Sequence, residues 1–152
     1  MSPIKNEKFG LLLTLLFALA SIIGLASLQP ISQDVSYHNF GDARTLFAIQ
    51  NFWNVLSNLP FLIVGLIGLH KLFNTDSLKL IPEMKLAYFF LFFGVALVAF
   101  GSGYYHVTPD NQTLVWDRLP MTIAFMALFS IIIAEFISIR IGNKLLWPLL
   151  IA

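Results

Sequence analysis

The sequence predicts an all-α fold, a polytopic transmembrane helix bundle with four complete spans and the start of a fifth. Of the 152 residues, 58% are hydrophobic and only 11% are charged, whereas about a quarter of the residues are charged in a typical soluble domain. The hydrophobic residues also gather into stretches of about 20, the length that a helix needs to cross the hydrocarbon core of a bilayer. We therefore expect lipid as the solvent around most of the chain.

The first expected span covers residues 9–28 and contains no charged residue. Residues 1–8 precede it with two lysines and form the expected cytoplasmic N-terminus. These lysines and Ala18-Leu19-Ala20 would also fit a signal peptide, but the apolar stretch exceeds the roughly 7–15 residues of a signal peptide's hydrophobic region. We therefore expect a retained, additional transmembrane helix in front of the main domain, residues 37–152.

Three further spans are expected at residues 51–70, 86–105 and 119–139. Pro60 falls near the middle of the first of these, where neighbouring helices can satisfy the carbonyl that a proline leaves free. A last apolar run begins at Leu145, and the residues from there to Ala152 are too few to cross a bilayer. We expect the chain to end inside a fifth helix and to be the N-terminal part of a longer protein.

Basic residues alternate between the two sides of these spans. Cytoplasmic segments carry an excess of Lys and Arg, so the richer side is expected to face the cytoplasm. That side holds Lys5, Lys8, Lys71, Lys79, Lys85, Arg140 and Lys144, and the other side holds Arg44 and Arg118. The N-terminus is therefore expected in the cytoplasm, with the loops at 34–50 and 107–117 on the extracytoplasmic face.

The composition excludes two classes of site. The net charge is +1 and no basic run is present, so nucleic acid is not an expected partner. The chain has no cysteine, which removes disulfides and thiolate metal ligands. Any bound metal must be held by histidine, carboxylate or carbonyl groups.

Two polar clusters lie at the expected outer ends of the spans. In the first, Ser102 and His106 are four residues apart and so share one helix face, and Asp117 follows after a short loop. In the second, Asn51, Asn54 and Asn58 form one polar stripe behind a polar segment at residues 37–44. Either cluster could serve only to pack helices, which small and amide residues commonly do in lipid, but an ionisable residue at membrane depth favours function.

The segment at 51–58 (Asn-Phe-Trp-Asn-Val-Leu-Ser-Asn), together with Ser102-x-x-x-His106 and Asp117-Arg118-Leu119-Pro120-Met121, resembles the alkaline ceramidase family. That family belongs to a superfamily of seven-helix membrane hydrolases and receptors. The resemblance covers roughly residues 37–135. It implies a zinc-dependent hydrolase that cleaves the N-acyl amide bond of ceramide or a similar lipid into a fatty acid and a sphingoid base, with a lipid amide substrate and membrane lipids as partners.

The resemblance also implies a role for each residue of the first cluster. His106 would be a zinc ligand, Ser102 would stabilise the developing oxyanion, and Asp117 would act as the general base on the attacking water. The family takes two further zinc ligands from a C-terminal His-x-x-x-His, which this sequence lacks; its other histidines are His38 and His70. Because a catalytic zinc needs three protein ligands, we do not expect this chain to be a competent enzyme alone.

Calcium is a second cofactor that the resemblance implies, since some family members bind it just before the asparagine-rich helix. Asp42 and Asn51 are the expected ligands here, although Asn51 and Phe40 stand where those members have acids, and calcium needs six to eight oxygens. Two other readings stay open. The chain could belong to a non-catalytic receptor or sensor on the same scaffold, or to an assembly protein whose polar residues only pack helices.

Overall fold

The structure is a computed structural model that describes residues 3–28, 31–75 and 78–151. Its elements are α1 (Pro3–Ser27), η1 (Val35–His38), α2 (Phe52–Leu56), α3 (Leu59–Asn74), η2 (Pro82–Met84), α4 (Lys85–Val107), α5 (Thr113–Phe136) and α6 (Ile139–Ile151), where η1 and η2 are short 3-10 helices. The described residues contain no β-strand, so the all-α prediction is confirmed.

Among the described residues, four helical stretches are long and apolar enough to cross a membrane, which confirms the four expected spans. They are Lys8–Ser27, Phe52–Asn74, Pro82–Val107 and Thr113–Phe136. The expected end of the fourth span at Ile139 was wrong, because the backbone leaves the helix at Ile137 (φ −121°, ψ −64°) and α6 begins two residues later. Residues 140–144, expected in a loop, therefore lie in α6, while Ala152 falls outside the described residues.

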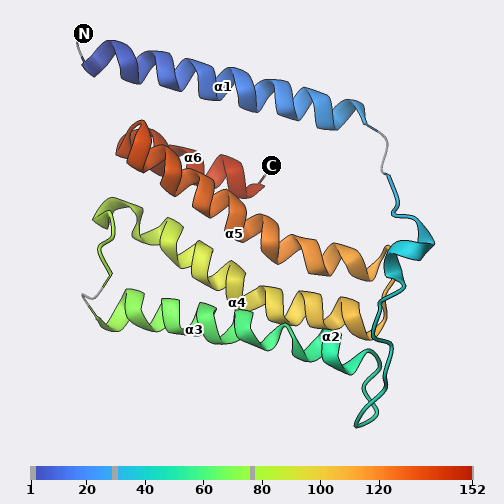
Figure 1. The fold of residues 1–152 in the computed structure, drawn as a ribbon. Coiled ribbons are helices and arrows are strands. Elements are labelled where there is room, and N and C mark those ends of the chain that lie inside the picture. Colours follow the sequence, from blue (N-terminus) through green and yellow to red (C-terminus); the bar gives the residue numbers. More distant parts are fainter. Residues whose placement is uncertain (1–2, 29–30, 76–77, 152) are drawn as a thin grey trace.

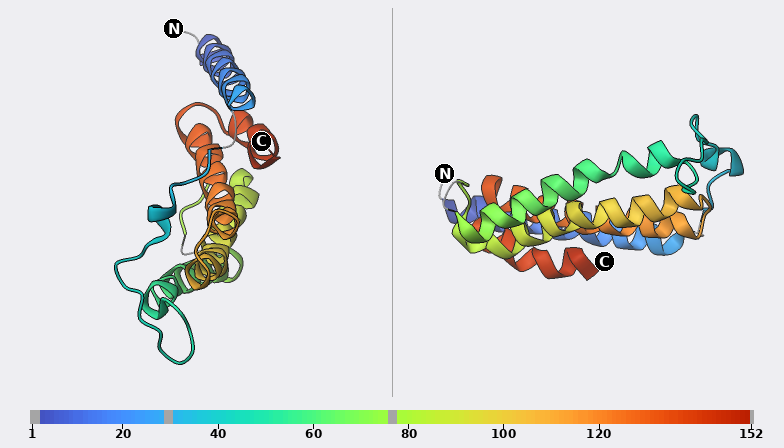
Figure 2. Two further views of the ribbon diagram at one scale, coloured as in Figure 1. Left: turned by 90° about the vertical axis from the view of Figure 1, so that its right-hand side faces the viewer. Right: turned by 90° about the horizontal axis from the view of Figure 1, so that it is seen from below.

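The helices α3, α4 and α5 run antiparallel in a row, and α6 turns back beside α5 (Figure 1). Seen along the helices, the row is curved and open rather than closed into a ring (Figure 2). The segment at 31–51 and the α4–α5 loop lie at the same end of the row (Figure 1). The polar clusters that the sequence placed on one face therefore do share one end of the molecule.

The second span is broken near its outer end. The helix α2 ends at Leu56, and α3 restarts at Leu59 with Pro60 among its first residues. Proline suits the first turn of a helix, because the N–H that it lacks would have no partner there anyway. Pro60 was expected in mid-span, and the structure instead places it at a helix start.

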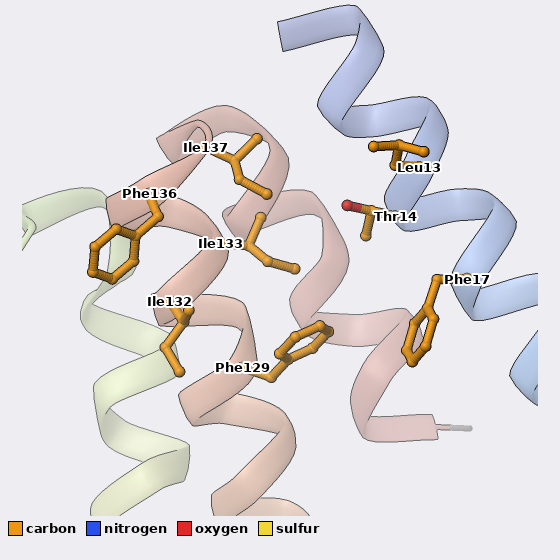
Figure 3. Close-up of a pocket in the computed structure, with 8 residues that line it drawn as sticks. All are labelled: Leu13, Thr14, Phe17, Phe129, Ile132, Ile133, Phe136 and Ile137. Atoms are coloured by element: carbon orange, nitrogen blue, oxygen red, sulfur yellow. The ribbon is translucent and has the colours of Figure 1, made fainter. Parts of the chain in front are cut away.

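The helix α1 packs loosely against the others. None of the residues in its apolar window is buried, and an apolar cavity of about 280 Å³ separates it from α5. Figure 3 shows the side chains that line this cavity: Leu13, Thr14, Phe17, Phe129, Ile132, Ile133, Phe136 and Ile137. The Thr14 hydroxyl, the one polar side-chain group in this lining, donates to the Gly10 carbonyl (2.9 Å) within α1.

The helices α4 and α5 approach closely through small residues. A Cβ atom added at Gly101 would collide with the Trp116 carbonyl oxygen, and one at Gly94 would lie 2.8 Å from the Ala124 nitrogen. Backbones can come this near only where side chains are minimal, which is a common basis of helix packing in lipid. Ser102 follows Gly101 on α4, and Asp117 follows Trp116 on α5. The close contact therefore brings Ser102 and Asp117 to the same end of the helix pair.

Replacing Gly101 by alanine should therefore force α4 and α5 apart. We expect Gly101→Ala to lower stability by about 1–3 kcal/mol, the usual range for overpacking a tight contact. The measurement is the thermal unfolding midpoint in detergent. Gly24→Ala is the matched control, because a Cβ at Gly24 would meet nothing within 4 Å; equal midpoints for the two variants would contradict this account of the contact.

Candidate functional site

The loops at the outer end are tied to one another by polar contacts. The main-chain N–H of Gln33 donates to Asn111 Oδ1 (2.9 Å), and Asn111 Nδ2 donates to the Gln33 carbonyl (3.2 Å). The Asp110 carboxylate accepts from the main-chain N–H groups of Gln112 and Thr113, both at 2.7 Å. These bonds to the N–H of Thr113 lower the pKa of the Asp110 carboxyl, so a charged side chain organises the start of α5.

Ser102 and His106 lie one turn apart near the C-terminal end of α4, which spans Lys85–Val107. Ser102 is buried and His106 is partly buried. Asp117 lies on α5, in its second turn, partly buried and within electrostatic range of His106. The tight α4–α5 contact thus carries all three predicted residues to one end of one helix pair.

Asp117 is adjacent to Arg118 in sequence but does not pair with it. In the part of the chain that the structure describes, the one ion pair joins Arg44 and Asp42. Successive helix residues point in different directions, which keeps the arginine away from this carboxylate. Asp117 therefore remains available as a charged acceptor beside the histidine.

The three asparagines of the polar stripe bond to main-chain carbonyls. Asn51 Nδ2 donates to the His106 carbonyl (2.8 Å), Asn54 Nδ2 to that of Asp42 (2.6 Å), and Asn58 Nδ2 to that of Asn54 (2.8 Å). Asn51 itself has a left-handed backbone (φ 50°, ψ 41°), a conformation that asparagine tolerates. These contacts favour the interpretation that the asparagines serve to pack the helices. The bond from Asn51 to His106 anchors the segment before α2 to the end of α4.

The expected calcium ligands are engaged elsewhere. Both carboxylate oxygens of Asp42 accept from the Arg44 guanidinium, at 2.5–3.1 Å, and this contact holds the pKa of the Asp42 carboxyl at about 2. The amide nitrogen of Asn51 bonds to His106, which leaves one oxygen on that side chain. Calcium needs six to eight oxygens, and this arrangement offers far fewer free oxygens than that. The assignment of Asp42 and Asn51 as calcium ligands stays a prediction.

The site also contains residues to which sequence reasoning assigned no role. Tyr105 is buried, and its hydroxyl lies 2.9 Å from His38 Nδ1, a residue 67 positions away. The Phe40 ring packs on His106 at a centroid distance of 4.7 Å. The one sequence signal for the contact between His38 and Tyr105 was the histidine in the polar segment at 37–44. Two residues so far apart in the sequence leave no local pattern of their contact.

A buried, unpartnered ring nitrogen makes His106 suitable as a metal ligand. Its Nδ1 atom is buried and has no hydrogen-bond partner, and neutral imidazole is a preferred ligand of zinc. No group of three His, Cys, Asp or Glu side chains that could enclose a metal occurs among the described residues. The residues present therefore fit one corner of a zinc site.

Comparison with known proteins supports the resemblance seen in the motifs. The ceramidase family profile matches residues 44–152, well over half of the chain and including Ser102, His106 and Asp117. Comparisons with curated proteins and with solved structures give no match. The described elements are all helical, include four potential membrane spans and bring Ser102, His106 and Asp117 to one end. With the family profile matched over residues 44–152, the chain belongs to the ceramidase family.

Proposed function

We propose that this chain forms the N-terminal part of a zinc-dependent membrane hydrolase that cleaves the N-acyl amide bond of ceramide or a similar lipid. Membership of the ceramidase family supports a lipid amide as the substrate. The observation that carries the proposal is the convergence of Ser102, His106 and Asp117 at one end of α4 and α5. A metal ligand, a hydroxyl donor and a carboxylate without an ion-pair partner are groups that zinc-dependent hydrolysis of an amide uses.

His106 is the zinc ligand that this chain contributes. When bound, zinc acts as a Lewis acid and lowers the pKa of a coordinated water to about 7. The bond from Asn51 to the His106 carbonyl and the packing of Phe40 against the ring hold the imidazole in place. Two more protein ligands are needed, and we expect a His-x-x-x-His on a further helix of the full-length protein to supply them.

Asp117 moves the protons of the reaction. Its carboxylate accepts a proton as water attacks the amide carbon, and it returns that proton to the nitrogen as the C–N bond breaks. The products are a fatty acid and a free amine, so every atom of the water is accounted for. A carboxylate that no arginine neutralises is suited to this exchange, which typically contributes about 10²–10⁴-fold in rate.

Ser102 stabilises the charge that develops on the carbonyl oxygen. Its hydroxyl can donate a hydrogen bond to that oxygen as the carbon becomes tetrahedral, and the buried position strengthens such a bond. The site lies at the helix ends, so the amide reaches it at the polar boundary while the acyl chain stays in lipid. The excess of basic residues on the other side of the spans supports an extracytoplasmic position for this end.

The first test concerns the metal. Full-length protein should retain zinc through purification, and His106→Ala should lower both its zinc content and its amidase activity to background, because one of three ligands is lost. Elemental analysis of purified protein measures the first quantity and release of fatty acid the second. His70→Ala, at an exposed histidine on α3, is the matched control and should change neither.

Two results would contradict the zinc assignment. One is unchanged zinc content in His106→Ala. The other is a complete reading frame with no further pair of histidines on a membrane helix.

The second test separates chemistry from folding. Asp117→Asn should lower kcat by about 10²–10⁴-fold and Ser102→Ala by about 10²–10³-fold, with zinc content and thermal midpoint close to wild type. Glu135→Gln and Ser27→Ala, both at exposed positions, are the controls and should retain activity. Full activity in either site variant would exclude the assigned role, and lost folding would instead favour the assembly interpretation.

The third test concerns orientation. Since the sequence contains no cysteine, Gln50→Cys and Lys79→Cys each introduce a single thiol at an exposed position. Gln50 lies just before α2, and Lys79 lies between the end of α3 and η2. A membrane-impermeant maleimide applied to intact cells should label Cys at position 50 and reach position 79 only after permeabilisation. The reverse pattern would place the site on the cytoplasmic face.

A further inference from the structure

The contact between His38 and Tyr105 joins the segment before α2 to the end of α4. His38 ends η1, and its Nδ1 atom lies 2.9 Å from the Tyr105 hydroxyl. The two rings meet edge to face at 5.8 Å, and the Tyr105 ring in turn lies 5.2 Å from that of His106. Only one tyrosine ring therefore separates His38 from the proposed metal ligand.

This contact constrains which ring nitrogen of His38 faces Tyr105. The hydrogen bond to His38 Nδ1 is the one that the Tyr105 hydroxyl makes within the described part of the chain. We assign the Tyr105 hydroxyl as the donor and Nδ1 as the acceptor, the arrangement in which both groups use this contact and the second ring nitrogen keeps a proton to donate. The neutral imidazole then carries its own proton on Nε2, because only one ring nitrogen is protonated in that form.

The protonated atom has no partner. His38 Nε2 is buried and makes no hydrogen bond. The same holds for His106 Nδ1, and the rings of the two histidines lie 5.8 and 5.2 Å from the Tyr105 ring. An unpartnered buried polar group costs stability and is rare in a folded protein unless a ligand completes it.

We propose that His38 is a substrate-positioning residue whose Nε2–H donates to a hydroxyl oxygen on the headgroup of the lipid amide. This inference rests on the proposed function. In this tautomer neither ring nitrogen is free to bind a metal, so His38 is a donor and His106 the ligand. Because His38 contacts Tyr105, three residues nearer the outer end of α4 than Ser102, it meets the polar headgroup, whereas Ser102 meets the amide.

The experiment compares two replacements of His38 in the full-length protein. His38→Asn places an amide where Nδ1 lies, so it can keep the bond to Tyr105 but loses the second donor. His38→Gln extends the amide toward the place of Nε2 and can restore that donor. Both are assayed on an N-acyl lipid with a hydroxylated headgroup and on its deoxy analogue, which lacks that hydroxyl.

We expect His38→Asn to lower kcat/KM on the hydroxylated lipid by roughly 3- to 10-fold, the effect of one neutral hydrogen bond, mainly through KM. Its activity on the deoxy analogue should match wild type, and His38→Gln should recover most of the loss on the hydroxylated lipid. Zinc content should stay unchanged in both variants, and the thermal midpoint should stay unchanged in His38→Asn, which keeps the bond to Tyr105. His70→Asn, on an exposed histidine, is the matched control and should not alter either substrate's kinetics.

Three results would overturn the proposal while wild-type protein still binds zinc and hydrolyses the amide. His38→Asn could behave as His70→Asn does, or both substrates could lose activity equally, or zinc and thermal stability could fall together with activity. The last two would make His38 a structural residue. A wild-type protein without zinc or amidase activity would instead contradict the proposed function itself.

Discussion

The close approach of α4 to α5 is the contact on which the rest of the structure depends. Apolar side chains gain little by leaving lipid for a helix interface, so association relies on fit between backbones. Gly101 permits that fit against the Trp116 carbonyl, one residue before Ser102 and one residue before Asp117. The same contact therefore holds the helix pair together and sets the spacing of the residues proposed to carry the chemistry.

Polar groups at this end of the molecule divide into two kinds. The asparagine amides, Asp110 and Asp42 have partners in the chain and fasten loops and helix ends. The nitrogens His38 Nε2 and His106 Nδ1 have none although both are buried. Because unpartnered polar atoms are costly in an apolar setting, this difference separates groups that maintain the fold from groups suited to a ligand.

The break between α2 and α3 has a consequence for the site. Ending α2 at Leu56 gives the outer end of the second span its own short helix, which contacts α4 beside the site. Asn51, just before α2, reaches the His106 carbonyl from there. By contrast α1 contributes no buried residue within its apolar window, so the site is built from α2, α4, α5 and the segment before them.

The sequence by itself determined the fold class, the four spans and the sharing of one helix face by Ser102 and His106. These features are local: a run of about 20 apolar residues suffices to specify a span, and a four-residue spacing specifies a face. The family could also be recognised from short motifs. The start of α6 at Ile139 and the helix break at Ser57–Asn58 were missed. The polar residues at these positions, Ser138 and the Ser57-Asn58 pair, are flanked by apolar runs that continue on both sides, so the local pattern shows no change of direction.

Only the tertiary structure decided which polar groups are paired. Arg44 occupies both oxygens of Asp42, the carboxylate that the sequence offered to calcium. Tyr105 meets His38 across 67 residues, and the amide nitrogen of Asn51 donates to the main-chain carbonyl of His106. A one-dimensional pattern shows which groups can ionise or donate a hydrogen bond, but their partners depend on how the helices pack and where the loops fold.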